Sequence, residues 1–176
     1  AHLLWINLVT DALPALTLIA DPLSPDIMKR SPRASSEQIL GRREWTQVVV
    51  VGLLEASVAL GLYWYLLLSA DETQARNFMF TAFVLSQLFR SFGARSATRL
   101  FWEVGALSNL WLLGVVALTG FVQLSLHYLP LAQAVFGLSP LSLSDLLFIL
   151  PFSLIPISLI ELRKLLLRFL ALRSKP

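Results

Sequence analysis

The sequence predicts an all-α fold: a polytopic membrane helical bundle of about five transmembrane helices. Of its 176 residues, 56% are hydrophobic and 14% are charged, whereas an average soluble domain is about 45–50% apolar and about 25% charged. So short a chain cannot hide that much apolar surface in its own core, so lipid must solvate much of it. Five stretches also approach the roughly 20 apolar residues that a helix needs to cross the hydrocarbon layer.

The predicted spans cover residues 3–20, 45–68, 75–93, 105–127 and 143–161. The first span is the least apolar, because it carries several polar residues and Pro14. The last contains Pro151 and Pro156, which a membrane helix tolerates when its neighbours satisfy the freed carbonyls. The connections are predicted as a polar loop, a short turn, a basic loop and an apolar loop, at 21–44, 69–74, 94–104 and 128–142.

The basic residues predict the orientation. Thirteen of the 14 lysines and arginines fall in or beside the loop 21–44, the loop 94–104 and the tail 162–176, and Arg76 alone lies on the other side. By the positive-inside rule these three regions are cytoplasmic. The sequence pI of about 9.7 therefore reflects membrane orientation, and no nucleic-acid partner is predicted. The absence of cysteine excludes disulfides and thiolate metal sites from this chain.

The first span carries the candidate metal ligands. Asn7, Thr10 and Asp11 are spaced i, i+3 and i+4, so an α-helix presents them on one face. An aspartate inside hydrocarbon costs at least about 2.5–3.5 kcal/mol and marks an ion pathway or a paired site. Pro14 has no N–H, so the carbonyl of Thr10 loses its helical partner. Such oxygen ligands suit Ca²⁺, which takes about six to eight, so other helices must complete the shell. Alternatively, Asn7 and Thr10 form interhelical hydrogen bonds and Asp11 pairs with a basic group.

Glu55 and the pair Glu161–Lys164 are further candidates for buried charge. Glu55 lies about ten residues beyond Trp45, which places it about 15 Å deep, near the middle of the bilayer. A neutral, hydrogen-bonded Glu55 is the simplest interpretation, and proton countertransport or cation ligation is the functional one. Glu161 and Lys164 are spaced i, i+3 at the cytoplasmic end of the last span, which predicts an ion pair.

Two motifs resemble a known family. The segment Asn7–Ala15, NLVTDALPA, followed by Asp26–Arg33, DIMKRSPR, resembles the sixth membrane helix and the following cytoplasmic loop of P-type cation pumps. The family usually has Gly where this chain has Ala12. The span pattern extends the resemblance over essentially the whole chain, as helices six to ten. It implies that Asn7 and Asp11 coordinate the transported ion and that Thr10 contributes to a second site. The sodium–potassium branch commonly has Asp in place of Asn7, so the resemblance favours calcium-type pumps.

Gln87 bears on the number of ions. In the eighth helix of two-ion calcium pumps a Glu ligand aligns with Gln87, and an amide there removes one negative charge. The resemblance therefore implies a single high-affinity site built around Asn7 and Asp11. Gln87 is equally well explained as an interhelical hydrogen-bonding residue. Arg90 either extends its charge to the cytoplasm or places it in the vacated site.

The function that the resemblance implies is part of the cation path of an ATP-driven pump for a divalent cation, Ca²⁺ or Mn²⁺. In that family ATP, with Mg²⁺, phosphorylates an aspartate in a DKTGT motif. Neither that motif nor a nucleotide-binding segment occurs here, so we expect no catalytic residue in this chain and no activity from it alone. The expected partners are an upstream part of the same pump and the lipid bilayer, in a bacterial inner membrane. The alternatives are a pump for Na⁺ or another monovalent cation, and a non-enzymatic membrane module or secondary transporter.

Overall fold

The computed structural model describes residues 2–22, 41–68 and 71–173, without the side chains of Asp11, Arg43, Glu44, Ala106 and residues 171–173. Every regular element among the described residues is a helix, so the predicted all-α class is confirmed. Most of the predicted loop 21–44, including the motif Asp26–Arg33, lies outside the described residues.

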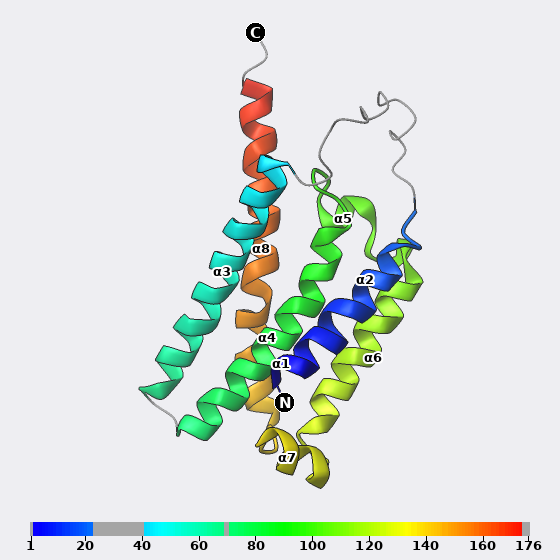
Figure 1. The fold of residues 1–176 in the computed structure, drawn as a ribbon. Coiled ribbons are helices and arrows are strands. Elements are labelled where there is room, and N and C mark those ends of the chain that lie inside the picture. Colours follow the sequence, from blue (N-terminus) through cyan, green and yellow to red (C-terminus); the bar gives the residue numbers. More distant parts are fainter. Residues whose placement is uncertain (1, 23–40, 69–70, 174–176) are drawn as a thin grey trace.

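The described residues form five helical rods, which run along the bundle (Figure 1). The first is continuous through three elements, α1, the π-helix η1 and α2, and the other four are α3, α4, α6 and α8. Their bounds are His2–Trp5 for α1, Ile6–Ala12 for η1, Leu13–Leu18 for α2, Arg42–Leu67 for α3, Glu72–Ala94 for α4, Leu110–Leu126 for α6 and Leu143–Arg173 for α8. The α4 helix contacts each of the other four rods, so it is the central element.

The rods differ in how well they match a membrane span. Among the described helices, α3 over Trp45–Leu67 and α8 over Leu143–Leu170 are long and apolar enough to cross a membrane. The α6 helix qualifies only together with α7, Pro130–Phe136, which is bent from it by 85°. The first rod is apolar but shorter than a typical span. The α4 helix carries many polar side chains and buries them inside the bundle, as an inner membrane helix does. Five spans remain the prediction from the sequence.

The largest differences from the predicted span ends are at the start of α6 and the end of α8. The α6 helix begins at Leu110 and not at 105, because Gly105 has a φ of 87° and Asn109 caps the helix by accepting from the Leu112 N–H. The short helices α5, Phe101–Val104, and η3, Ala106–Ser108, precede it. The predicted tail is helical through Arg173, because α8 continues through its two prolines.

The segment predicted as an apolar loop, 128–142, contains the short helix α7. Pro130 lies in its first turn, where a missing N–H costs nothing, and Gly137 ends it in the left-handed conformation, φ 61°. At this end of the bundle His127 is fully buried. Its ring nitrogens lie 2.8 Å from the Thr81 hydroxyl and 2.8 Å from the Ser139 carbonyl oxygen.

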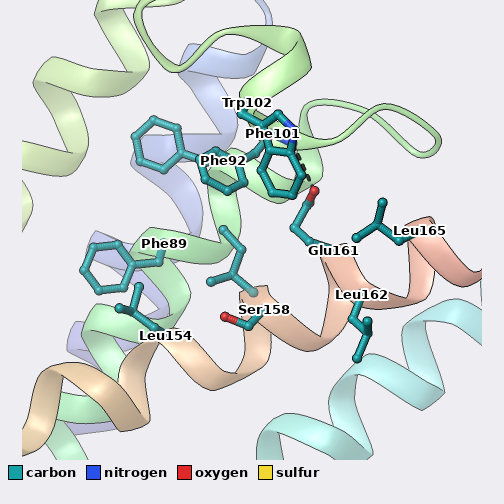
Figure 2. A pocket seen from close by; sticks show the side chains of 10 residues that line it. Phe89, Phe92, Phe101, Trp102, Leu154, Ser158, Glu161, Leu162 and Leu165 are labelled. Carbon is teal, nitrogen blue, oxygen red and sulfur yellow. Dashed lines mark hydrogen bonds between the residues drawn. The ribbon is translucent and has the colours of Figure 1, made fainter.

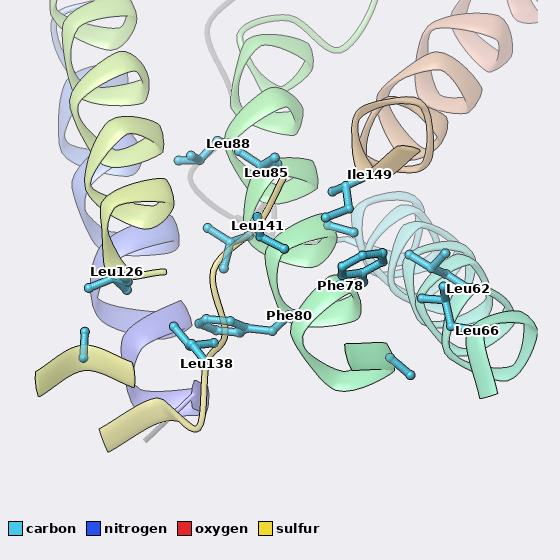
Figure 3. Packing of buried hydrophobic residues seen from close by; sticks show 14 residues of the cluster. Leu62, Leu66, Phe78, Phe80, Leu85, Leu88, Leu126, Leu138, Leu141 and Ile149 are labelled. Atoms are coloured by element: carbon cyan, nitrogen blue, oxygen red, sulfur yellow. The ribbon is translucent and has the colours of Figure 1, made fainter. Parts of the chain in front are cut away.

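The hydrophobic core surrounds α4 (Figure 3). Apolar side chains of α4 share one buried cluster with side chains of α3, α6 and α8. The cluster includes Phe78, Phe80, Leu85 and Leu88 of α4, Leu62 and Leu66 of α3, Leu126 of α6, Ile149 of α8, and Leu141. Lipid is as apolar as leucine, so close packing and interhelical hydrogen bonds hold such helices together, more than removal from water. The core therefore fixes the other rods relative to α4.

The two ends of the bundle separate as the charges predicted. The end of α2, the beginning of α3, the α5 segment and the C-terminal end of α8 lie at one end, and α7 lies at the other (Figure 1). The 94–104 loop and the last turns of α8 thus lie at the same end of the bundle, and their cytoplasmic position stays a prediction from the charges.

Candidate functional site

The segment with the predicted ligands is a π-helix, Ile6–Ala12, inside the first rod. The Thr10 hydroxyl donates to the Ile6 carbonyl oxygen at 2.6 Å, a contact that competes with the regular backbone bond. Pro14, two residues beyond the segment, offers no N–H to the preceding turn. Both effects favour the backbone hydrogen bonds between residues i and i+5 that define the wider turn of a π-helix. Such π-helical turns occur often at functional sites.

The π-helix separates two of the predicted ligands. Thr10 is 3% exposed, whereas Asn7 is exposed at the surface of this chain. Each residue of a π-helix advances through a smaller angle than in an α-helix, so side chains three positions apart no longer share a face. The prediction of one common α-helical face is therefore wrong for Asn7 and Thr10. The backbone of Asp11 lies in the same π-helix, and its side chain lies outside the described part.

Thr10 faces the central helix across a groove. The groove has a volume of about 280 Å³ and is lined by Thr10, Pro14, Ala15 and Leu18 from the first rod and by Gln87, Arg90, Ser91 and Ala94 from α4. The structure therefore brings Thr10 to the same cavity as Gln87 and Arg90. Asn7 is not part of this lining.

Glu55 of α3 joins Gln87 and Arg90 in one polar network. The Arg90 Nε lies 2.8 Å from the Glu55 Oε1, and the Gln87 Nε2 donates to the Glu55 Oε2 at 3.0 Å. The Arg90 Nη2 donates to the Gln87 Oε1. Glu55 and Gln87 are 8% and 7% exposed. The prediction of a hydrogen-bonded Glu55 did not include this ion-pair contact with Arg90.

This network decides where the positive charge of Arg90 lies. Two partners inside the bundle hold the guanidinium, although its side chain stays 35% exposed. A buried carboxylate needs such a partner, because a lone buried charge loses its hydration without compensation. Arg90 thus places its guanidinium beside the groove that Thr10 lines.

A second network was missed by sequence reasoning. The Arg95 Nε lies 2.7 Å from Asp21 Oδ1, and the Arg95 side chain is 1% exposed. Asn109 also donates to Asp21 Oδ1, at 3.0 Å. In the sequence Arg95 served as one of several orientation markers, and nothing in the spacing of these three residues along the chain relates them.

The predicted ion pair of Glu161 and Lys164 is confirmed, at 2.7 Å. Glu161 also accepts a hydrogen bond from the Phe101 N–H at 3.0 Å, the dashed line in Figure 2. It lies at the edge of a cavity of about 650 Å³ between α4, α5 and α8, which is otherwise lined mainly by aromatic and aliphatic side chains. The pair therefore fastens the segment after α4 to α8.

The chain is similar to the membrane regions of known ion pumps. Residues 1–166 match the family described as cation transporting ATPase, C-terminus. Residue identity is 32% over 170 residues with calcium-transporting ATPase 1 of Bacillus cereus, covering 88% of this chain and 19% of that protein. Identity is 32% over 153 residues with calcium-transporting ATPase 1 of Yarrowia lipolytica, covering 83% and 16%. With human calcium-transporting ATPase type 2C member 2 it is 31% over 150 residues, covering 84% and 16%.

The chain thus spans less than a fifth of the length of these relatives. The family match covers nearly all of it, and the relatives are P-type ATPases, as the motif Asn7–Ala15 predicted. The chain therefore belongs to the family of cation-transporting ATPase C-terminal membrane regions, in its calcium-type branch.

Proposed function

We propose that the parent protein is an ATP-driven pump for a divalent cation, Ca²⁺ or Mn²⁺, and that this chain supplies part of the transmembrane cation site. The observation that carries the proposal is the π-helical segment Ile6–Ala12, which contains Asn7, Thr10 and Asp11, in a chain whose relatives bear the name calcium-transporting ATPase. ATP and Mg²⁺ act in the upstream part of the parent.

The chemistry of the segment supports a hard cation. Asn7 offers an amide oxygen and Asp11 a carboxylate, and Pro14 leaves a backbone carbonyl of the preceding turn without its α-helical donor. The Thr10 hydroxyl donates its proton to Ile6, which leaves its oxygen able to accept or to ligate. Since Ca²⁺ takes about six to eight oxygens, upstream helices must supply the rest. The exposed position of Asn7 gives them a surface to approach.

The arrangement supports one cation for each cycle. Gln87 has no negative charge, and the guanidinium of Arg90, held by Glu55 and Gln87, lines the groove at Thr10. A second divalent ion at this groove meets a fixed like charge in a medium of low dielectric constant, where repulsion is strong. We therefore assign the ion site to Asn7 and Asp11, and to Glu55 and Gln87 the role of holding Arg90.

The location that follows is an integral, multi-pass position in a membrane. The relatives come from a bacterium, a yeast and a mammal, so a bacterial inner membrane stays a prediction from the compact loops. The parent's other membrane helices and its cytoplasmic domains are the proposed partners of this chain.

The test uses the full-length parent. Asp11→Asn removes the main counter-charge of the ion, so phosphorylation by ATP in the presence of Ca²⁺ or Mn²⁺ should be lost. Phosphorylation by inorganic phosphate, measured without the transported cation, should persist and serves as the folding control. Normal cation-dependent phosphoenzyme in this variant rules out the site. ATPase activity that responds to Na⁺ but not to Ca²⁺ or Mn²⁺ supports the monovalent alternative.

The stoichiometry has its own test. Equilibrium binding of radioactive Ca²⁺ to the parent, divided by its phosphorylation capacity, should give one ion for each phosphorylation site. A ratio of two contradicts the role assigned to Arg90.

A further inference from the structure

A cluster of polar side chains fastens the cytoplasmic end of the first rod to the rest of the bundle. We call Asp21, Arg95 and Asn109 the cytoplasmic clamp. Arg95 follows the end of α4, and its Nε lies 2.7 Å from Asp21 Oδ1. Its other two nitrogens donate to the Gly105 carbonyl oxygen at 2.7 Å and to the Ser108 hydroxyl at 2.6 Å. At 1% exposure, this arginine has exchanged water for three protein partners, so its position is tightly determined.

Asn109 makes the clamp a three-element junction. Its Nδ2 donates to Asp21 Oδ1 and to the Thr17 carbonyl oxygen, both at 3.0 Å. Its Oδ1 accepts from the Leu112 N–H at 2.9 Å, which caps the beginning of α6. The side chain is 3% exposed. One asparagine therefore joins the end of the first rod to the start of α6, while Arg95 joins it to the end of α4.

The opposite end of the first rod is also held. The Trp5 Nε1 donates to the Gln123 Oε1 of α6 at 2.8 Å, and the Trp5 ring packs edge-on against Phe136 of α7 with centroids 5.7 Å apart. The π-helix Ile6–Ala12 thus lies between two anchors, Trp5 on one side and Asp21 on the other. Both anchors attach to the body formed by α4, α6 and α7.

Fixed ends restrict how the segment between them can wind. Conversion of the π-helix to an α-helix changes both its length and the rotation of one end relative to the other. It also rotates Thr10 with respect to Asn7 and Asp11. With the ends anchored, this conversion requires an anchor to break. We infer that the cytoplasmic clamp is a positioning device that keeps residues 6–12 in the π-helical winding and thereby sets the cation affinity of the site.

This inference rests on the proposed function for its affinity readout, and on the fold alone for its structural readout. The variants are Asp21→Asn, Arg95→Gln and Asn109→Ser in the full-length parent. Serine is also a good helix cap, so Asn109→Ser keeps the cap of α6 and removes only the two donors of the clamp. The matched control is Arg168→Gln. Arg168 of α8 pairs with Glu103 of α5 and donates to the Thr98 carbonyl oxygen, all at exposed positions and none of them with a residue of the first rod.

The affinity readout is the cation concentration that gives half-maximal phosphorylation by ATP. We expect the clamp variants to raise it by about tenfold, within the usual range for coupling between separated sites, with phosphorylation by inorganic phosphate unchanged. The hydrogen bond from Arg168 lowers the pKa of the Glu103 carboxyl to about 2, so the control pair stays charged at assay pH. Arg168→Gln should leave the half-maximal concentration within about twofold, as for other exposed pairs.

The structural readout is backbone hydrogen exchange over residues 6–12 in lipid nanodiscs without cation. It should accelerate in Asp21→Asn and Asn109→Ser and stay unchanged in Arg168→Gln. If exchange and half-maximal concentration both match the wild type, the clamp is only a packing feature and the inference is wrong. If the wild-type parent shows no cation-dependent phosphorylation, the proposed function fails, and the exchange data alone decide on the clamp.

Discussion

Replacing Lys164 by methionine probes the most deeply buried ion pair among the described side chains. Lys164 and Glu161 have side chains 6% and 5% exposed, with 2.7 Å between Nζ and Oε1. The ammonium also donates to the carbonyl oxygens of Gly93 at 2.9 Å and Arg99 at 3.3 Å. Methionine keeps most of the shape and removes the charge, so Glu161 is left buried with only the Phe101 N–H as a partner.

The expected cost follows from this geometry. Removing one partner of a buried ion pair costs about 3–5 kcal/mol, because the remaining charge is uncompensated. Both Lys164→Met and the double variant Lys164→Met with Glu161→Leu remove the donor to the Gly93 and Arg99 carbonyl oxygens. The double variant leaves no uncompensated charge, and its additional loss is the acceptor of the Phe101 N–H, about 1–3 kcal/mol. The double variant should therefore be more stable than Lys164→Met alone.

The assay is the apparent melting temperature of the full-length parent in nanodiscs, followed by tryptophan fluorescence. At about 2–4 °C for each kcal/mol in a folded unit of 150–250 residues, Lys164→Met should lower it by about 6 °C or more. The double variant should recover part of that loss. The exposed pair of Arg168 and Glu103 provides the control, since Arg168→Gln should leave the melting temperature nearly unchanged.

Two results contradict this reasoning. If Lys164→Met melts within about 2 °C of the wild type, which corresponds to less than about 1 kcal/mol, water reaches the pair and the charges are not buried. If the double variant loses as much stability as the two single variants together, the side chains do not act through each other.

Three further predictions concern the end of the bundle opposite the cytoplasmic clamp. Trp5→Phe removes the donor to Gln123, which is fully buried, and should destabilise the parent by about 1–3 kcal/mol; an unchanged melting temperature contradicts this. Gly137→Ala places a Cβ where φ is 61° and should cost about 1–2 kcal/mol, whereas Gly114→Ala, with open space around it, should match or exceed the wild type. Thr81→Val leaves the buried His127 Nε2 without its partner at 2.8 Å and should also cost about 1–3 kcal/mol, whereas Thr81→Ser should retain most of the stability.

Features that depend on neighbouring positions in the chain could be predicted from the sequence. The helical class and the pair Glu161–Lys164 follow from apolar runs and from i, i+3 spacing, and the structure confirms both. Helices also cover most of each predicted span, and the spans themselves stay a prediction. The motifs Asn7–Ala15 and Asp26–Arg33, with the pattern of spans, indicated the family, and the family match over residues 1–166 confirms it. The helix α7 was missed, because an apolar segment between two spans carries no strong period of its own.

Pairings between rods could not be predicted in the same way. Glu55 is 35 positions from Arg90, and Asp21 is 74 positions from Arg95, and no rule of helical spacing relates residues so far apart. Their contacts depend on how α3 and the first rod pack on α4, which is decided by the shape of many side chains together.

Hydropathy and residue chemistry are local properties, so the amino-acid sequence was sufficient to predict a helical membrane region with candidate oxygen ligands in its first rod. The packing of the helices was needed to see that Thr10 and Asn7 lie in different environments, that Arg90 lies against Glu55, and that Asp21 lies against Arg95. In a medium of low dielectric constant each polar group must find a partner, and which partner it finds depends on the packing of helices that are distant in the sequence.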